Sequence, residues 1–345
     1  MLFSCKSLKL SYLVAIGLLA SASVKAADFY AGKQITLVVS SDVGNTYDLT
    51  GRIIARHLQR FIPGTPSIIV QNMPGAGGLR AMNWLYNVAP KDGLTLGLVN
   101  NTLAFNPLYG DKLAQFDAQK FNWLGTPNKD NSLFIVWQAV PVKTIEEARN
   151  RELVLAATGA GSTPAFWARV AAAIFDLKVR IIPGYKSQGE SFMAMERGEN
   201  DGNAAPFWAS LNSDFPGWIE QGKIRALVYY GPTRDPDIPA PYAMDLIKDP
   251  AKRSLLEVAQ AGIAMGRPVL APPGVDPAKV QVLRDAMSAM FRDPEYLREC
   301  TQVARLKCDT SWSGAEITKF IAEMYAAPKD AVEKISEIFA QGQTQ

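Results

Sequence analysis

Short runs of β-branched and other apolar residues alternate along the chain with stretches in which apolar side chains recur every three or four positions. Residues 35–39, 67–71 and 95–99 have the pattern of strands, and residues 47–61 and 79–88 between them have that of amphipathic helices. A strand–helix–strand alternation of this kind is typical of an α/β domain built on a parallel sheet.

The same alternation begins again in the middle of the chain. Strands are expected over residues 153–157, 179–182 and 224–229, with helices over residues 164–176 and 190–197. Because the pattern starts twice, we expect two α/β lobes with a cleft between them.

The C-terminal third has mostly helical periodicity. Ser313 and Glu316 form a capping box, and Asp276 and Asp293 each precede a proline, as at the start of many helices. The last helical stretch, residues 313–340, should break near Pro328.

The first 26 residues differ from the rest of the chain. Lys6 and Lys9 precede an apolar run over residues 10–20, and Val24-Lys25-Ala26 offers small residues where a signal peptidase reads them. An apolar run this short cannot span a membrane core, which needs roughly 20 residues. We therefore expect a signal peptide over residues 1–26 and an exported, periplasmic protein.

The formal charge of +3 comes entirely from the three lysines of this segment. Without them basic and acidic residues are equal in number, so the exported chain lacks the positive field that nucleic-acid binding requires. Residues 72–78 are rich in glycine, but no Gly-Lys-Ser/Thr follows and Arg80 interrupts the dinucleotide fingerprint. We expect neither a nucleic-acid partner nor a cofactor.

Cys300 and Cys308 are the cysteines that remain after Cys5 leaves with the signal segment. In an oxidising compartment an even pair this close in sequence is a candidate disulfide. Two separately buried thiols are the alternative.

His57 is the single histidine of the chain, and the helical pattern predicts that it lies on a solvated helix face. A catalytic triad could use only this residue, no Gly-x-Ser-x-Gly elbow is present, and His-Glu-x-x-His is absent, so we expect neither an enzyme of these classes nor a metal site. A carboxylate pair acting on a small acid stays open as the enzyme alternative.

Three loops that link a strand to a helix are rich in Gly, Ser, Thr and Asn, at residues 38–48, 70–80 and 156–166. Free backbone N–H groups and the helix dipole make such a turn a candidate anion site. If the first and third loops faced each other, they could hold the two ends of a small dianion; ordinary turns and caps are the alternative.

Several short motifs occur in a fixed order: QNMPGAGG at residues 71–78, APKDG at 89–93, NPLY at 106–109 and GENDG at 198–202. In these segments the chain resembles the periplasmic receptors of tripartite tricarboxylate transporters, the Bug or TctC-like family. The resemblance implies a two-lobed type II binding-protein fold with two hinge crossings, an organic acid in the cleft and membrane transporter subunits as partners.

This family likeness implies a discontinuous first lobe, residues 27–127 and 231–345, and a second lobe over residues 128–230. We expect a monomer. By position, the residues that resemble ligand contacts of the first lobe are Ser40, Gly44, Asn45, Asp48, Asn72, Gly75, Ala76 and Thr102. Those of the second lobe are Thr158, Gly161, Ser162, Tyr185 and Asp201.

The sequence departs from the family pattern at several positions. Two ligand classes therefore stay possible, a di- or tricarboxylate and an aromatic carboxylate. Residues 40–45 read Ser-Ser-Asp-Val-Gly-Asn in place of Pro-Phe-Ala-Pro-Gly-Gly, and Asp42 should face solvent. Phe166 stands where the family often has histidine. The aromatic residues that either face the ligand or pack in the core are Phe105, Phe166, Tyr185, Phe207 and Trp208. A periplasmic sensor that signals to a membrane partner would have the same sequence features.

Overall fold

The computed structural model describes residues 29–159, 162–232 and 234–341. The predicted signal peptide and Gly161 lie outside the described residues.

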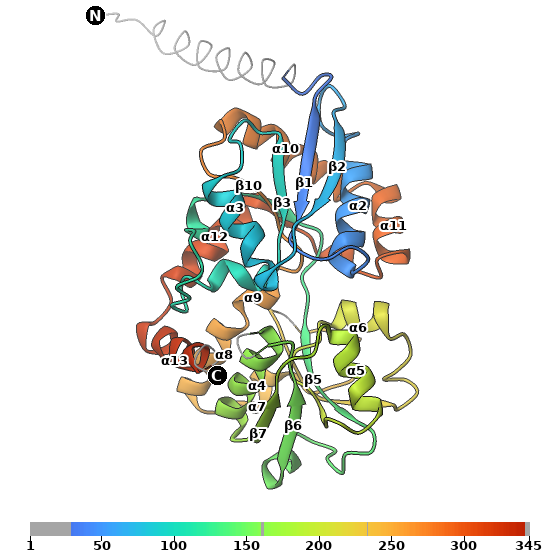
Figure 1. Ribbon diagram of the computed structural model, residues 1–345, viewed down its shortest axis with the longest axis vertical. Helices are drawn as coiled ribbons and strands as arrows, with labels where there is room; N and C mark the ends of the chain where they lie inside the picture. Colours follow the sequence, from blue (N-terminus) through green and yellow to red (C-terminus); the bar gives the residue numbers. More distant parts are fainter. Residues whose placement is uncertain (1–28, 160–161, 233, 342–345) are drawn as a thin grey trace, which may run out of the picture.

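Six strands form the first sheet, in the order β11-β4-β10-β3-β1-β2 (Figure 1). They are β1 (Gln34–Val39), β2 (Ser67–Asn72), β3 (Thr95–Leu98), β4 (Asn122–Thr126), β10 (Val269–Ala271) and β11 (Trp312–Ser313). Strand β1 pairs in parallel with β2 and β3, whereas β10 runs antiparallel between β3 and β4. The helices of this lobe are α2 (Thr46–Leu58), α3 (Leu79–Asn87), α10 (Pro277–Met290), α11 (Pro294–Gln302) and α12 (Gly314–Tyr325). We call this sheet with its helices lobe 1.

The second sheet has five strands in the order β7-β6-β8-β5-β9. They are β5 (Ser132–Trp137), β6 (Glu152–Ala156), β7 (Lys178–Ile182), β8 (Gly202–Asn203) and β9 (Ile224–Tyr230). Strands β6 and β7 are parallel, and β5 runs antiparallel to β8 and β9. With α4 (Thr163–Phe175), α5 (Gln188–Glu196), α6 (Trp208–Asp214) and α7 (Ala243–Leu246) it forms lobe 2.

The C-terminal helical stretch breaks where the sequence predicts. Helix α12 ends at Tyr325, and α13 (Lys329–Ala340) begins directly after Pro328. Proline has no N–H to donate, so it cannot continue a helix but suits a helix start.

Helix α13 leaves lobe 1 and packs against α4 of lobe 2 and against α8 (Pro250–Ala259) (Figure 1). Its buried Ile335 and Ile338 share one apolar cluster with Leu256 of α8 and Trp167 of α4. Helix α13 extends from lobe 1 to lobe 2 because the residues that cover its apolar face lie there.

This packing differs from the expected division of the chain. The strands of the first sheet fall within residues 27–127 and 231–345, and those of the second within residues 128–230. Helices α7, α8 and α13, however, belong by sequence to the expected first lobe and contact β9 and α4 of lobe 2.

Helix α9 (Ala261–Ala264) lies between the lobes and contacts η2 (Asn101–Phe105), a short 3₁₀ helix of lobe 1 (Figure 1). The contact is close: a Cβ on Gly262 would lie 2.9 Å from the Cα of Thr102. Glycine is therefore required at position 262.

Cys300 of α11 and Cys308 are joined by a disulfide. Among the described residues, no helix is both long and apolar enough to cross a membrane.

Candidate functional site

A cavity of about 650 Å³ lies between the lobes. The loop before α3 forms part of its wall on lobe 1, and the loop before α4 forms part of its wall on lobe 2. Gly262 of α9 and Phe339 of α13 complete the lining at other points. Its volume is within the range of ligand-binding pockets.

The lobe 2 wall includes Thr158, Ser162, Thr163 and Pro164. Ser162 is the N-cap of α4, but its hydroxyl group bonds with Gly159, donating to the carbonyl oxygen at 2.7 Å and accepting from the N–H at 3.2 Å. Among the described residues, the N-cap side chain makes no capping hydrogen bond to the first turn of α4. The positive end of the helix dipole therefore lies at the cavity wall, where it favours a carboxylate, and Pro164 gives this turn one N–H donor fewer.

On lobe 1 the loop from β2 to α3 contributes Ala76 and Gly77 to the cavity wall. Gly75, Gly77 and Gly78 have φ angles of 130°, 64° and 99°, a region in which residues with a side chain are strained. This requirement explains the glycines of the Pro-Gly-Ala-Gly-Gly motif. Like α4, α3 begins without a side-chain cap.

Thr102 lines the cavity next to this loop, and Asn100 fixes its position. The side-chain oxygen of Asn100 accepts hydrogen bonds from the backbone N–H of Thr102 at 3.2 Å and from its hydroxyl group at 3.0 Å. Asn100 also faces the cavity.

The loop from β1 to α2, residues 40–45, contributes no described residue to the cavity wall. The side-chain oxygen of Asn45 accepts from the N–H of Asp48 at 3.0 Å and caps α2. The Asp48 carboxylate accepts from the N–H of Gly44 at 2.9 Å, from Asn72 Nδ2 at 3.0 Å and from Arg52 at 2.9 and 3.1 Å. The polar groups of this loop thus bind one another.

The Asp48 carboxylate is held ionised by these contacts. Burial acts to raise its pKa, but the hydrogen bonds from Arg52, Gly44 and Asn72 lower the pKa below its usual value. A carboxylate fixed in this way would repel an acid ligand rather than bind it.

Some of the residues expected to contact a ligand line the cavity, and others do not. Those that line the cavity are Ala76, Thr102, Thr158 and Ser162. Those outside the lining are Ser40, Gly44, Asn45, Asp48, Asn72, Gly75, Tyr185 and Asp201. Contact of either group with a ligand stays a prediction.

Two of the residues outside the lining have clear local roles. Ser40 is buried, and its hydroxyl oxygen accepts from the N–H of Asn100 at 2.9 Å. Asp201 accepts from the N–H of Val154 at 2.8 Å and pairs with Arg151 at 3.3 Å.

The aromatic residues divide as well. Phe166 and Phe207 line the cavity, whereas Phe105, Tyr185 and Trp208 do not. Phe105 is fully buried and packs on Tyr109 and Phe320, so core packing accounts for it.

Sequence reasoning missed several lining residues, among them Tyr109, Lys112, Gln188 and Phe339. Tyr109 belongs to the Asn-Pro-Leu-Tyr motif, so that motif offered a signal for it. Phe339 is near the C-terminus, and nothing in its local sequence distinguishes it from a core residue of an amphipathic helix.

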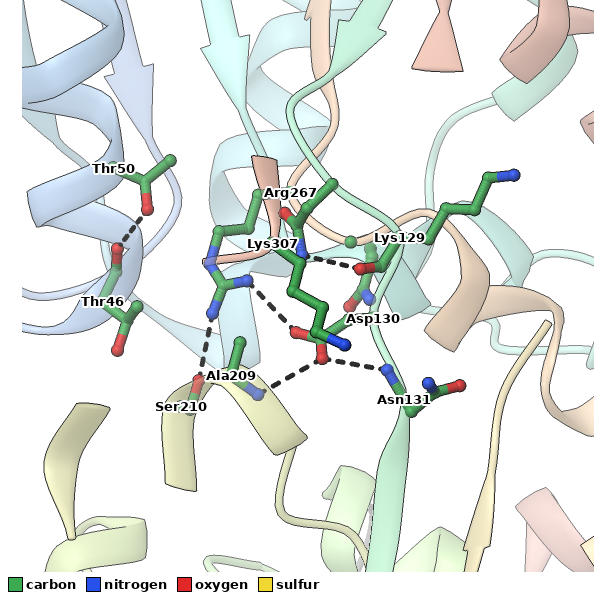
Figure 2. A network of polar contacts seen from close by, with 12 residues as sticks. Thr46, Thr50, Lys129, Asp130, Asn131, Ala209, Ser210, Arg267 and Lys307 are labelled. Atoms are coloured by element: carbon green, nitrogen blue, oxygen red, sulfur yellow. Dashed lines mark hydrogen bonds and ion pairs between the residues drawn. The ribbon is translucent and has the colours of Figure 1, made fainter. Parts of the chain in front are cut away.

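A buried ion pair connects the segment between β4 and β5 with both lobes (Figure 2). Arg267 Nη1 lies 3.2 Å from Asp130 Oδ2, and Arg267 Nη2 donates to the hydroxyl group of Ser210 in α6 at 3.1 Å. The N–H of Ala209 donates to Asp130 at 3.4 Å. Burial raises the pKa of Asp130, and Arg267 opposes this effect. Neither charged group lines the cavity, so the pair positions the lobes rather than the ligand.

The prediction that His57 lies on a solvated face is wrong. Its side chain is buried between α2 and α11, with Nε2 2.6 Å from Glu299 Oε2. His57, Asp293 and Glu295 lie close enough together to share a metal ion, but Arg60 already pairs with both carboxylates. The cluster is therefore a set of ion pairs that joins the two helices.

Comparison with known proteins agrees with this architecture. The model of the tripartite tricarboxylate transporter family receptor (TctC) matches residues 52–336. A protein of Cupriavidus necator, described as a UPF0065 protein in the gbd 5' region, is 28% identical over 337 residues, which cover 95% of each chain.

Two solved structures share the fold. A TctC solute-binding protein from Polaromonas aligns with a TM-score of 0.65 and 18% identity, over 90% of this chain and 99% of that one. MatC from Rhodopseudomonas palustris with bound malate aligns with a TM-score of 0.64 and 19% identity, over 88% and 99% of the two chains. The chain is thus a two-lobed periplasmic binding protein by fold, and it belongs to the tripartite tricarboxylate transporter receptor family.

Proposed function

We propose that this protein is a periplasmic receptor that captures a small organic carboxylate between its lobes and delivers it to the membrane subunits of a tripartite transporter. The observation that carries the proposal is the uncapped first turn of α4, which faces the interlobe cavity. A partly buried helix N-terminus stabilises an anion by up to about 2 kcal/mol.

Lys112 supplies the complementary charge. Among the described residues of the cavity wall it is the single basic side chain. The other charged residue of the wall, Asp111, accepts hydrogen bonds from Asn106 Nδ2 at 2.8 Å and from the N–H of Leu113 at 3.0 Å. MatC, which shares the fold, is described with bound malate, and this supports a carboxylate ligand here.

A thermal-shift screen of organic acids tests the binding step. A ligand that binds only the native state stabilises it by about 2.7 kcal/mol at a hundred times its dissociation constant, so a true ligand raises Tm clearly. If no carboxylate of a broad panel raises Tm, the proposal is wrong. Recovery of a hit chemically unchanged after incubation distinguishes a receptor from an enzyme.

A matched pair of variants tests the site. Ser162→Ala should weaken binding of any hit about threefold to tenfold, because it loosens the turn that presents α4 to the cavity. Ser313→Ala removes the N-cap of α12 in lobe 1, outside the cavity wall, and should leave affinity unchanged. Equal affinities in both variants would contradict the assignment.

The delivery step needs a test in cells. Deleting the gene should abolish uptake of the hit compound, and the full-length gene with its signal segment should restore it. A deletion strain that takes up the compound normally but no longer responds to it would instead indicate a sensor.

A further inference from the structure

Three aromatic rings from three distant segments meet on the cavity wall. Tyr109 comes from lobe 1, Phe166 from the first turn of α4, and Phe339 from the last turn of α13. Their ring centroids are 5.8 Å apart for Tyr109 and Phe166, 6.0 Å for Phe166 and Phe339, and 6.2 Å for Tyr109 and Phe339. We call these residues the aromatic wall.

The one polar group of the aromatic wall, the hydroxyl group of Tyr109, already has a hydrogen-bond partner. The hydroxyl group of Tyr109 donates to the carbonyl oxygen of Val258 at 3.0 Å and is buried. Burial also raises the pKa of Tyr109 far above its usual value, so the ring stays neutral. Toward the cavity the wall therefore offers carbon surface and no hydrogen-bonding group of its own.

The aromatic wall lies one helical turn from the anion-binding end of the site. Phe166 follows the N-cap Ser162 by four residues, which corresponds to about 6 Å along the helix axis. A carboxylate held at the first turn of α4 would place the atoms attached to it against these rings. Leu79, Leu103 and Leu113 also line the cavity and extend its apolar surface.

A small dicarboxylate does not fit this wall chemically. A carboxylate placed against these rings would lose water without gaining a partner from them, because the Tyr109 hydroxyl group already donates to Val258 and the two phenylalanine rings have no donor. An unpaired charge or hydroxyl group against apolar surface costs several kcal/mol. A ring in the same place gains buried apolar area and favourable ring contacts.

We propose that the ligand is an arylcarboxylate, with one carboxylate at the N-terminus of α4 and its ring against Tyr109, Phe166 and Phe339. The inference rests on the proposed receptor function and narrows its ligand class. It also assigns Phe166 and Phe339 as residues that determine specificity.

Titration calorimetry with two sets of probes tests the ligand class. Benzoate, phenylacetate and 4-hydroxyphenylacetate should bind at least tenfold more tightly than malate, succinate and citrate. Tighter binding of the aliphatic acids would overturn this inference and leave the receptor function intact. If no acid of either set binds, both proposals fail.

Two conservative variants test the wall itself. Phe166→Leu and Phe339→Leu keep an apolar side chain but remove the ring, so each should lower affinity for the best arylcarboxylate about threefold to tenfold. Phe215→Leu is the control, because Phe215 is a half-buried ring of lobe 2 that contacts Phe192 and Trp218 outside the cavity wall. Tm of each ligand-free variant shows whether it has folded.

An arylcarboxylate affinity that is the same in all three variants would overturn the aromatic wall as the ring site. A further variant, Phe166→His, replaces the ring with a polar side chain that can carry a positive charge. It should reduce the preference for arylcarboxylates over malate, and an unchanged preference would contradict the role of Phe166 in specificity.

Discussion

Two loops with similar composition begin equivalent helices in the two lobes, and the structure uses them differently. The loop before α2 satisfies its own polar groups through Asn45, Asp48 and Asn72, away from the cavity. The loop before α4 leaves the first turn uncapped and lines the cavity. A strand–loop–helix unit can therefore stabilise its lobe or bind an anion, and the difference depends on whether a side chain already occupies the helix N-terminus.

The largest expected effect comes from removing the Asp48 carboxylate. Asp48→Ala removes a buried carboxylate that accepts hydrogen bonds from Gly44, Asn72 and Arg52, and we expect the free energy of unfolding to fall by about 2 kcal/mol. Urea denaturation measures this change. Asp42→Ala, at an exposed position of the same loop, should change stability by less than about 0.5 kcal/mol. Similar values for both variants would contradict the structural role of Asp48.

A smaller loss is expected for Asn72→Ala. The side-chain amide of Asn72 donates to the carbonyl oxygen of Ser41 and to Asp48, and losing both bonds should cost about 1 kcal/mol. The double variant with Asp48→Ala should lose less than the sum of the two single variants, because one bond is shared. Strict additivity would show that the two side chains act independently.

The pH dependence of stability should reveal the same carboxylate. Because the pKa of Asp48 is lower in the folded protein than in the unfolded chain, its contribution is present above about pH 4 and is lost as the pH falls through the folded value. The difference in free energy of unfolding between the wild type and Asp48→Asn should therefore narrow as the pH falls below about 4. A constant difference would mean that the charge of Asp48 does not stabilise the loop.

The smallest expected effect on stability comes from the other loop. The hydroxyl group of Ser162 bonds only with Gly159 among the contacts of the described residues, so Ser162→Ala should change the free energy of unfolding by about 0.5 kcal/mol or less. If Ser162→Ala lowered the free energy of unfolding as much as Asp48→Ala does, the two loops would not differ in their contribution to stability.

Much of the fold could be predicted because its signals are local. In β1, α2, β6 and α4 the spacing of apolar residues can be recognised within a short stretch of sequence. Pro328 separates the last two helices because proline has no N–H to continue a helix. The strands β8, β10 and β11 have only two or three residues each, too few for a period to appear. Strands β8 and β10 are ordered by the strands on either side of them, and the edge strand β11 is ordered by its pairing with β4.

The position of α13 is determined by its packing against other segments and not by its local sequence. Its pattern predicts an amphipathic helix, but not which apolar surface would cover Ile335 and Ile338. The packing on α4 and α8 brings Phe339 to the cavity, although Phe339 lies 173 residues from Phe166 in the sequence. Contacts between distant segments have no local signature.

By itself the sequence determined the two α/β units, the family motifs and the glycines of the loop before α3, because each depends on local backbone preference or short-range periodicity. Only the tertiary structure decided which of the similar loops faces the cavity. That choice depends on the hydrogen bonds of Asp48 and Asn72, whose side chains come from separate segments, and on the rings that three segments bring together.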